Sequence, residues 1–328
     1  MHRTRYDVEM IRVVCWIAVA ITAGACDKKR APAASGALSS AESELLSRVP
    51  AGNHLVWGGS YAKLQDFMQR SALGRASREA AEEMGGKGMA TWMQCISSMQ
   101  SLRFAGGIRF GDAGTEMRMV TSGAGIDDFR GCATKAGLTA AVDPDGKFLR
   151  VELPGPSEPI AQGYLVVADR VLYMRGAINF GAGMTITSAP RAQLEADVAG
   201  AREHSAATDA STSALLAKVD RSKTAWFAGN ATPIAKGLGE VYGSLDVNNG
   251  IAVDVVVQFT DQQLQTQIED NLDQVKKHVD EAPSKAMKQL VDNISARRVG
   301  DRTRFSLKAT DEQLDALMQM SGGMFGGM

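Results

Sequence analysis

The sequence predicts an α+β protein made of two tandem duplicated units, each an antiparallel sheet with helices packed on one face. Three observations lead to this expectation. Short apolar runs alternate with polar residues, which indicates strands with one buried face. Segments with apolar residues at helical spacing follow pairs of these runs. An internal match relates the first half of the chain to the second.

Composition and charge bound the class of protein before any motif is considered. The chain has 328 residues, of which 45% are hydrophobic and 22% are charged, as in ordinary globular proteins. Lys plus Arg is 36 and Asp plus Glu is 37, so a strongly basic nucleic-acid binder is not expected. Four His and four Cys leave little material for a metalloenzyme. We therefore predict no metal, no cofactor and no nucleic-acid partner.

The N-terminus has the features of a secretory signal. Basic residues precede an apolar run over 13–21, and small residues follow it up to Ala25. The run is too short to cross a hydrocarbon core of about 30 Å. We predict a signal peptide over residues 1–25, with Met10 as an alternative start.

The segment Ala23-Gly24-Ala25-Cys26 resembles a bacterial lipobox, in which the Cys becomes the first mature residue and carries lipid. This predicts a lipid anchor on Cys26, which would hold the protein at a membrane of the cell envelope, facing the periplasm or the exterior. Cleavage after Ala25 by an ordinary signal peptidase is the alternative. Asp27 resembles an inner-membrane retention signal of enteric bacteria, and the choice between inner and outer membrane stays open. Residues 26–39 are charged and then rich in Pro, Ala, Ser and Gly, which predicts a flexible tether.

The internal match begins with a short helix, a turn and an apolar strand. Residues 43–49 align with 213–219, and at the same spacing residues 55–59 align with 225–229. The match continues at a shorter spacing over two predicted hairpins. In these, 106–110 aligns with 243–247 and 116–120 aligns with 253–257, with Asn249-Gly250 as a hairpin turn.

Further elements complete the two units. A helix follows each hairpin, and the second is predicted to begin with a capping box of Thr260 and Gln263. Another such box, of Thr310 and Gln313, is predicted to begin the last helix. The remaining expected elements are helix 126–136, strand 148–153, an added hairpin over 163–175, helix 190–201, strand 303–308 and helix 311–320.

The predicted organisation is thus unit one over 40–188, a connector over 189–204, unit two over 205–320 and a disordered Gly/Met tail over 321–328. Two unrelated domains with shared patterns are the alternative to a duplication. Whether the two sheets join into one is left open by the sequence.

Several of these features together resemble uncharacterised envelope lipoproteins of bacteria, notably those abundant in myxobacteria. The residues that carry the resemblance are Cys26, Val49-Pro50, Cys95, Cys132 and 215–227. Such proteins have a lipobox, a tether, and a first half ordered as leader helix, strand, Cys, hairpin, Cys. The resemblance covers most of the chain, implies an envelope location, and implies no activity.

Two of the four cysteines remain after export. Cys15 lies in the signal peptide and Cys26 is the lipidation site, which leaves Cys95 and Cys132 in an oxidising compartment. We predict a structural disulfide between them; a redox pair or half of a metal site is the alternative. The 16 Met residues raise a Cu(I) site as a further alternative, but their spacing favours core filling and the Gly/Met tail.

One motif suggests an enzyme. Ser60-Tyr61-Ala62-Lys63 matches the Ser-x-x-Lys of penicillin-recognising serine enzymes, in which Lys63 would activate Ser60. The segment 223–225 is Lys-Thr-Ala where such enzymes have Lys-Thr-Gly, and no second motif stands between. An N-cap role for Ser60 explains it better. A serine acyl-enzyme is our third and least favoured hypothesis, and we predict no catalytic residue.

Aromatic residues on the matched strands are the candidate binding residues. Trp57, Trp226 and Phe227 either pack in a core or line a site for a hydrophobic ligand. The first functional hypothesis is a non-enzymatic binding or scaffold module with a protein partner in the envelope. The alternative is a carrier or sensor of a lipid or another apolar molecule.

Overall fold

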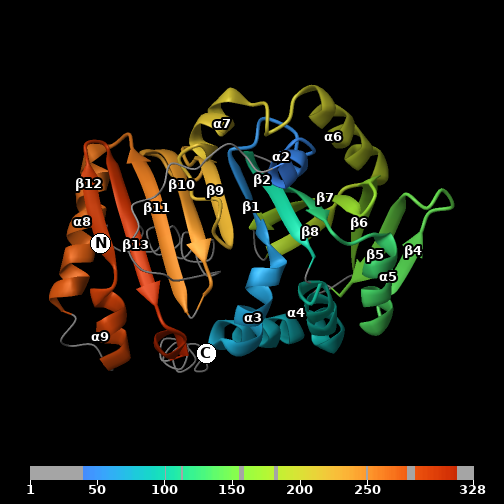
Figure 1. Cartoon of the computed structure of the whole chain (residues 1–328), viewed down its shortest axis with the longest axis horizontal. Helices are drawn as coiled ribbons and strands as arrows, with labels where there is room; N and C mark the ends of the chain where they lie inside the picture. The colour runs from blue at the N-terminus through green and yellow to red at the C-terminus, as the bar shows by residue number, and fades with distance from the viewer. Residues whose placement is uncertain are drawn as a thin grey trace.

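A computed structural model describes residues 40–99, 101–111, 114–154, 159–180, 184–248, 250–278 and 285–315. The predicted signal peptide, Cys26, the tether and the Gly/Met tail lie outside these residues. The fold is α+β with antiparallel strand pairing, as predicted. The strands form one sheet of 13 strands, with the path β12-β13-β11-β10-β9-β1-β2-β3-β7-β6-β5-β4 and with β8 paired to β7. The two predicted sheets therefore join into one (Figure 1).

The described strands and helices range from 4 to 26 residues in length, and the longest helical segment, Ala72–Ser97, is kinked at Gly86. The strands are β1 (Leu55–Ser60), β2 (Arg103–Gly111), β3 (Gly114–Ser122), β4 (Thr139–Val142), β5 (Phe148–Leu153), β6 (Ile160–Ala168), β7 (Val171–Phe180), β8 (Met184–Ser188), β9 (Ala225–Asn230), β10 (Leu238–Asp246), β11 (Ile251–Phe259), β12 (Ser295–Val299) and β13 (Arg302–Ala309). The helices are α2 (Ser40–Leu46), α3 (Tyr61–Arg70), α4 (Ala72–Ser97), α5 (Ile126–Lys135), α6 (Arg191–Glu203), α7 (Ala210–Leu216), α8 (Gln262–Lys277) and α9 (Lys285–Asp292).

The two units meet where β1 pairs with β9, a junction that we call the seam. These are the strands that the internal sequence match relates, and Trp57 pairs directly with its own counterpart Phe227. Leu55 pairs with Gly229, and Gly59 pairs with Ala225. Because residues 55–59 align with 225–229, exchanging the two units leaves this register unchanged. The seam therefore has local two-fold symmetry, like the self-complementary interface of a homodimer.

Outside the seam the two halves repeat and then diverge. β2 pairs with β1 and β10 pairs with β9, each followed by its hairpin partner, β3 or β11. In the second unit β13 lies beside β11. In the first unit the added hairpin, β6 and β7, lies between β3 and β5 in the sheet, so β5 is displaced outward. The extra hairpin of the first unit is thus an insertion within the sheet rather than an appendage.

The sequence alignment of the two hairpins is wrong by one residue on their second strands. It matched Met119 with Val256. The structure places Met119 opposite Gly106 and places Val255, not Val256, opposite Gly243. The reason is that the second hairpin closes one residue earlier, which shifts every later residue of β11 by one position.

The sheet has helices on both faces, whereas the sequence predicted them on one face of each unit. The first face includes Val56, Val120 and Trp226, and its core contains side chains of α2, α6 and α7. The second face has two cores. One, around Val255, includes side chains of α3, α8 and α9, and the other, around Leu172, includes side chains of α4 and α5. In each unit the leader helix packs on the first face and the helix after the hairpin packs on the second.

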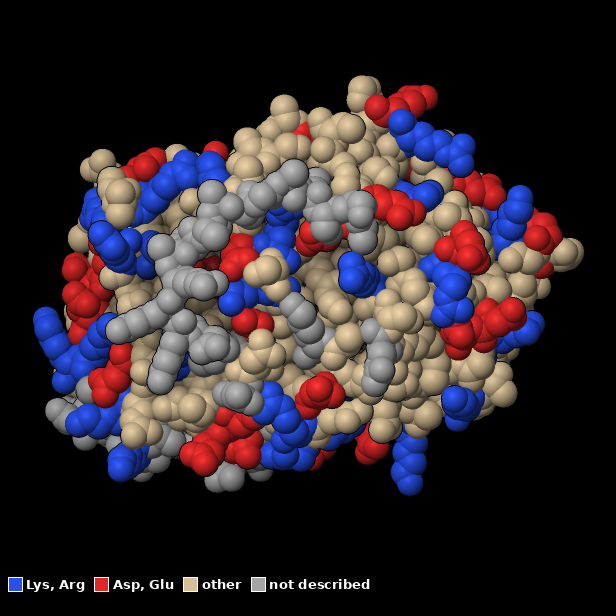
Figure 2. All heavy atoms as spheres, in the orientation of Figure 1, with Lys and Arg blue, Asp and Glu red and all other residues tan. Residues whose placement is uncertain are grey.

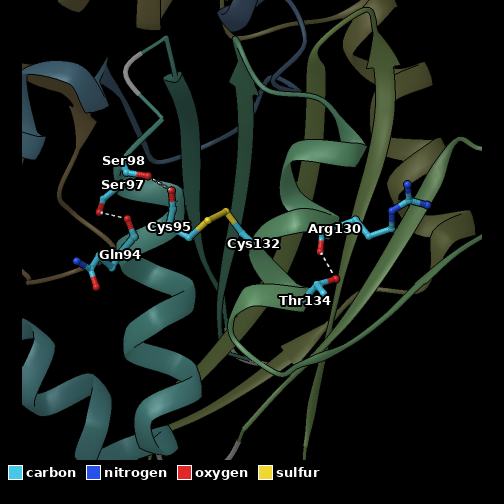
Figure 3. Close-up of a disulfide and its surroundings, with 7 residues drawn as sticks. All are labelled: Gln94, Cys95, Ser97, Ser98, Arg130, Cys132 and Thr134. Atoms are coloured by element: carbon cyan, nitrogen blue, oxygen red, sulfur yellow. Dashed lines mark hydrogen bonds between the residues drawn. A yellow bond between two sulfur atoms is a disulfide. The ribbon is translucent and has the colours of Figure 1, made fainter.

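The predicted disulfide is present. Cys95 lies near the end of α4 and Cys132 lies on α5, with their Cα atoms 5.5 Å apart. Figure 3 shows the bond running between the two helices. Cys132 is buried among the apolar residues of the α4–α5 core, so the bond holds two helices on one part of the sheet. Within the described ranges, no helix has the length and apolar character needed to cross a bilayer.

Of the two predicted capping boxes, one is confirmed and one is wrong. Thr310 N donates to Gln313 Oε1 at 2.9 Å, and Gln313 N donates to Thr310 Oγ1 at 3.2 Å. At α8 the N-cap is Asp261 rather than Thr260, and its carboxylate accepts hydrogen bonds from two backbone N–H groups. The backbone N–H groups of Thr260 and Asp261 both donate to Gly237 O, at 2.9 and 3.3 Å, so the helix begins only after Asp261.

The close packing at the seam predicts that a larger residue at Gly58 lowers the stability of the protein. A Cβ atom at Gly58 would overlap the indole ring of Trp226, which lies across the seam on the same face. We expect Gly58→Ala to lower the free energy of unfolding by about 1–3 kcal/mol, because the packed seam has no room for a methyl group. Urea denaturation followed by circular dichroism measures this.

Gly131→Ala is the matched control. Gly131 lies on α5 with open space where its Cβ would be, so this variant should gain about 0.5–1 kcal/mol. Equal stability of the two variants would contradict close packing at the seam.

Candidate binding surface

Two of the three predicted binding residues meet at the seam. Trp57 and Phe227 are cross-strand partners on the second face, and both are half-buried. Their neighbours on the outer strands are glycines: Gly106 is opposite Trp57, and Gly243 is opposite Phe227. A Cβ on either glycine would collide with the aromatic ring beside it. The missing side chains let both rings lie against the backbone of the next strand.

Leu55 and Ile108 extend this surface. They pair directly with each other on β1 and β2, they share the face of Trp57, and both are half-buried. We call Leu55, Trp57, Ile108 and Phe227 the seam strip. Leu55, Trp57 and Ile108 belong to none of the three cores found among the described residues. The strip is therefore apolar surface between the two cores of the second face.

Trp226 lies on the opposite face of the sheet. It is 2% exposed, belongs to the first-face core, and its indole Nε1 donates to Glu42 Oε1 at 3.1 Å. Successive side chains of a strand point to opposite faces, so Trp226 and Phe227 cannot share one site. The structure thus places Trp226 in a core contact with α2, away from the seam strip.

The residues of the Ser-x-x-Lys motif lie beside the seam. Ser60 is the N-cap of α3 and its side chain makes no capping hydrogen bond, while its backbone N donates to Thr224 O at 3.1 Å. Lys223 Nζ lies 3.0 Å from Asp246 Oδ2, and Thr224 Oγ1 lies 3.1 Å from Asp246 Oδ1. The segment that resembled a Lys-Thr-Gly motif therefore binds the buried carboxylate of Asp246 at the end of β10. The side chain of Lys63 lies outside what the structure describes.

A buried charge network on the first face was missed by sequence reasoning. Asp197 on α6 accepts two hydrogen bonds of 3.0 Å from Arg175 and one of 2.8 Å from the Tyr173 hydroxyl. Arg118 Nε also lies 3.4 Å from Asp197, and Glu116 accepts bonds of 2.9 Å from both arginines. The side chains of Arg118, Arg175 and Asp197 are 7%, 12% and 12% exposed.

This network joins α6 to β3 and β7 with its charges balanced. Burial and the neighbouring Asp197 raise the pKa of Tyr173 far above its usual value, so the hydroxyl stays protonated and donates to Asp197. The only signal in the sequence is that Glu116 and Arg118 interrupt the apolar strand β3 at alternate positions. Their other partners, Arg175 and Asp197, are distant in the chain, so no local pattern reveals the network.

A polar groove lies away from the seam strip. It runs along α8 and has a volume of about 650 Å³. It is lined by Gln262, Gln263, Thr266, Gln267, Asp270, Asn271 and Gln274. None of the seam-strip residues lines it. Among the residues that the structure describes, no group of three His, Cys, Asp or Glu side chains could hold a metal ion.

Surface charge on the face drawn in Figure 2 is mixed in sign. Basic and acidic side chains alternate around its rim, with uncharged surface between them. This mixture agrees with a formal net charge of −1 for the whole chain.

Comparisons with known proteins give distant structural likenesses alone. No protein-family model matches the sequence, and no curated protein matches it. The fold is similar to crystal form I of TP0453, at 12% identity and a TM-score of 0.44, over 84% of this chain and 96% of that one. It is also similar to crystal form IV of TP0453, at 10% identity and a TM-score of 0.41, with the same coverage.

The charge network predicts a large effect from one substitution. Asp197→Ala removes the carboxylate that Arg118 and Arg175 share, which leaves two buried guanidinium groups short of a partner. We expect the free energy of unfolding to fall by about 3–5 kcal/mol, measured by urea denaturation.

Glu152→Ala provides the comparison, because it breaks an exposed pair with Arg150. This variant should cost about 0–1 kcal/mol. If Asp197→Ala cost no more than Glu152→Ala, the network would not stabilise the fold as described.

Proposed function

We propose that this protein is a lipid-anchored lipoprotein of the bacterial cell envelope that acts as a non-enzymatic binding or scaffold module. The observation that carries the binding role is the seam strip, an apolar surface on rigid strands where the two units meet. The anchor rests on the sequence around Cys26, which lies outside the described residues.

The seam strip has the composition of a protein-binding surface. Its tryptophan and phenylalanine are flanked by aliphatic residues, and large apolar side chains in a firm setting carry most of the energy of protein interfaces. The setting is firm because β1 pairs on both sides, with β2 and with β9. Such a strip loses little conformational freedom when a partner covers it.

The shape of the site favours a partner over an enclosed ligand. The seam strip lies on one face of the sheet between two cores, and the groove along α8 is polar and separate from it. A carrier would instead enclose most of its ligand in an apolar pocket. A carrier or sensor of an apolar molecule is kept as an outcome of the test below.

The anchor gives the first expected result. Cys26→Ser should abolish incorporation of labelled palmitate into the protein, because the thiol that carries the acyl chains is gone. The exported variant should also be lost from the membrane fraction. Cys15→Ser is the matched control, since Cys15 lies in the predicted signal peptide and should not affect labelling. Wild-type protein without label, or equal labelling of the Cys26→Ser variant, would contradict a lipid anchor at this residue.

The seam strip gives the second expected result. A photo-crosslinking phenylalanine analogue in place of Trp57 should give one discrete protein adduct in cells, identified by mass spectrometry. The adduct should be lost when Phe227→Ser is added, because the partner would lose the neighbouring ring. The same analogue in place of the exposed Arg130 on α5 is the control and should give no such adduct.

The test separates the two binding roles. An adduct with lipid alone at position 57 would replace the partner-binding role with the carrier role. Equal labelling at positions 57 and 130 would contradict any binding role for the seam strip.

A further inference from the structure

The seam strip has a candidate occupant within this chain. Residues 316–328, which we call the 316–328 segment, follow the last described residue, Asp315. We infer that the 316–328 segment folds back over the seam strip and competes with the partner that binds there. The competition rests on the proposed function, whereas the contact between segment and strip does not.

The chemistry of the seam strip selects an uncharged occupant. β1, β2 and β9 carry only apolar residues or glycine at their second-face positions. Leu55, Trp57, Ile108 and Phe227 are half-buried, so part of each side chain is accessible. A charged side chain brought onto this surface would lose water without gaining a partner. The occupant is therefore expected to be apolar.

The 316–328 segment has this character. It contains no Asp, Glu, Lys, Arg or His, and its 13 residues include four Met, one Leu and one Phe. Methionine thioethers make favourable contacts with aromatic rings, and the seam strip offers the rings of Trp57 and Phe227. The four glycines of the segment allow its backbone to approach a surface closely. Segment and strip therefore match in polarity and in the kind of contact they can make.

The described residues end in a core that the seam strip borders. A helix begins at Asp311, and its Leu314 is 7% exposed within the second-face core around Val255. Phe227 of the seam strip packs against the same core. The 316–328 segment therefore starts on the face of the sheet that carries the seam strip.

Contacts of Arg70 show that the segment is long enough. The Arg70 guanidinium pairs with Asp311 and donates to Val247 O at 3.2 Å. Val247 is four residues beyond Gly243, the cross-strand partner of Phe227, which places the two about 15 Å apart along the sheet. Thirteen extended residues span up to about 43 Å, so the segment can cross this distance and cover the strip.

A covering segment would control access to the seam strip. Because the segment is tethered beside the strip, it acts at a high effective concentration and covers the strip when no partner is present. A partner must displace it, so the apparent affinity of the partner falls with the fraction of molecules in which the strip is open. The cover would also keep the apolar surface from non-specific association.

Crosslinking in the purified protein tests the contact in the absence of a partner. The full-length chain carries the photo-crosslinking phenylalanine analogue in place of Trp57, and linked peptides are identified by mass spectrometry after proteolysis. We expect a link from position 57 to the 316–328 segment within one chain, at a yield that does not depend on protein concentration. The analogue in place of Arg130 on α5 should give no such link.

Two charge-matched variants locate the contact within the segment. Met324→Asp with Phe325→Asp should reduce the link from position 57 by about tenfold or more, because carboxylates are costly to bury in an apolar contact. Gln319→Asp with Ser321→Asp adds the same charge at polar positions and should keep the link. An unchanged urea midpoint confirms that both variants fold.

The same variants test the competition in cells. With Met324→Asp and Phe325→Asp, the analogue at position 57 should give at least about threefold more protein adduct, because the strip is open in more molecules. Adduct formation that ignores these substitutions would contradict the competition. A link within the chain without any protein adduct would refute the proposed partner while supporting the contact, so the two failures are distinguishable.

Two results in the purified protein would overturn the inference. One is the lack of a link from position 57 to the 316–328 segment, or equal links from positions 57 and 130. The other is a link found only between two chains, which would make a second copy of the protein the occupant of the seam strip.

Discussion

The antiparallel pairing of β1 with β9 is the constraint on which the rest of the structure depends. Each strand would otherwise be an open edge, with unpaired N–H and C=O groups. The local two-fold register lets two similar units close each other's edge, as two subunits of a homodimer would. Both units then extend outward from this junction, the first to β4 and the second to β12.

The seam also decides where the large aromatic residues go. Gly58 makes room for Trp226 on the first face, and Gly106 and Gly243 make room for Trp57 and Phe227 on the second. Trp226 is thereby buried against α2, while the other two rings stay half-buried. Glycines that lie opposite aromatic residues on neighbouring strands thus allow a core contact on the first face and a candidate binding surface on the second.

The seam strip lies on the second face of the sheet, between the two cores of that face. The first unit is stiffened separately. The Cys95–Cys132 bond links α4 to α5, and Asp197 ties α6 to β3 and β7 through Arg118 and Arg175. These ties stabilise the sheet that carries the seam strip.

Local patterns in the sequence determined the fold class and many of the elements, and elimination of the other two cysteines determined the disulfide. The strand over Phe148–Leu153 and the α5 helix follow from apolar periodicity, and the Thr310–Gln313 cap follows from adjacent side chains, because these features depend on residues close in the chain. Only the tertiary structure decided that the sheets join, that β6 and β7 enter between β3 and β5, and that Trp226 and Phe227 lie on opposite faces of the completed sheet. It also decided the network around Asp197. Each of these features depends on which strand edges or charged side chains, distant in the chain, pair with each other. The local sequence of a strand edge or of a carboxylate does not indicate which partner it will bind.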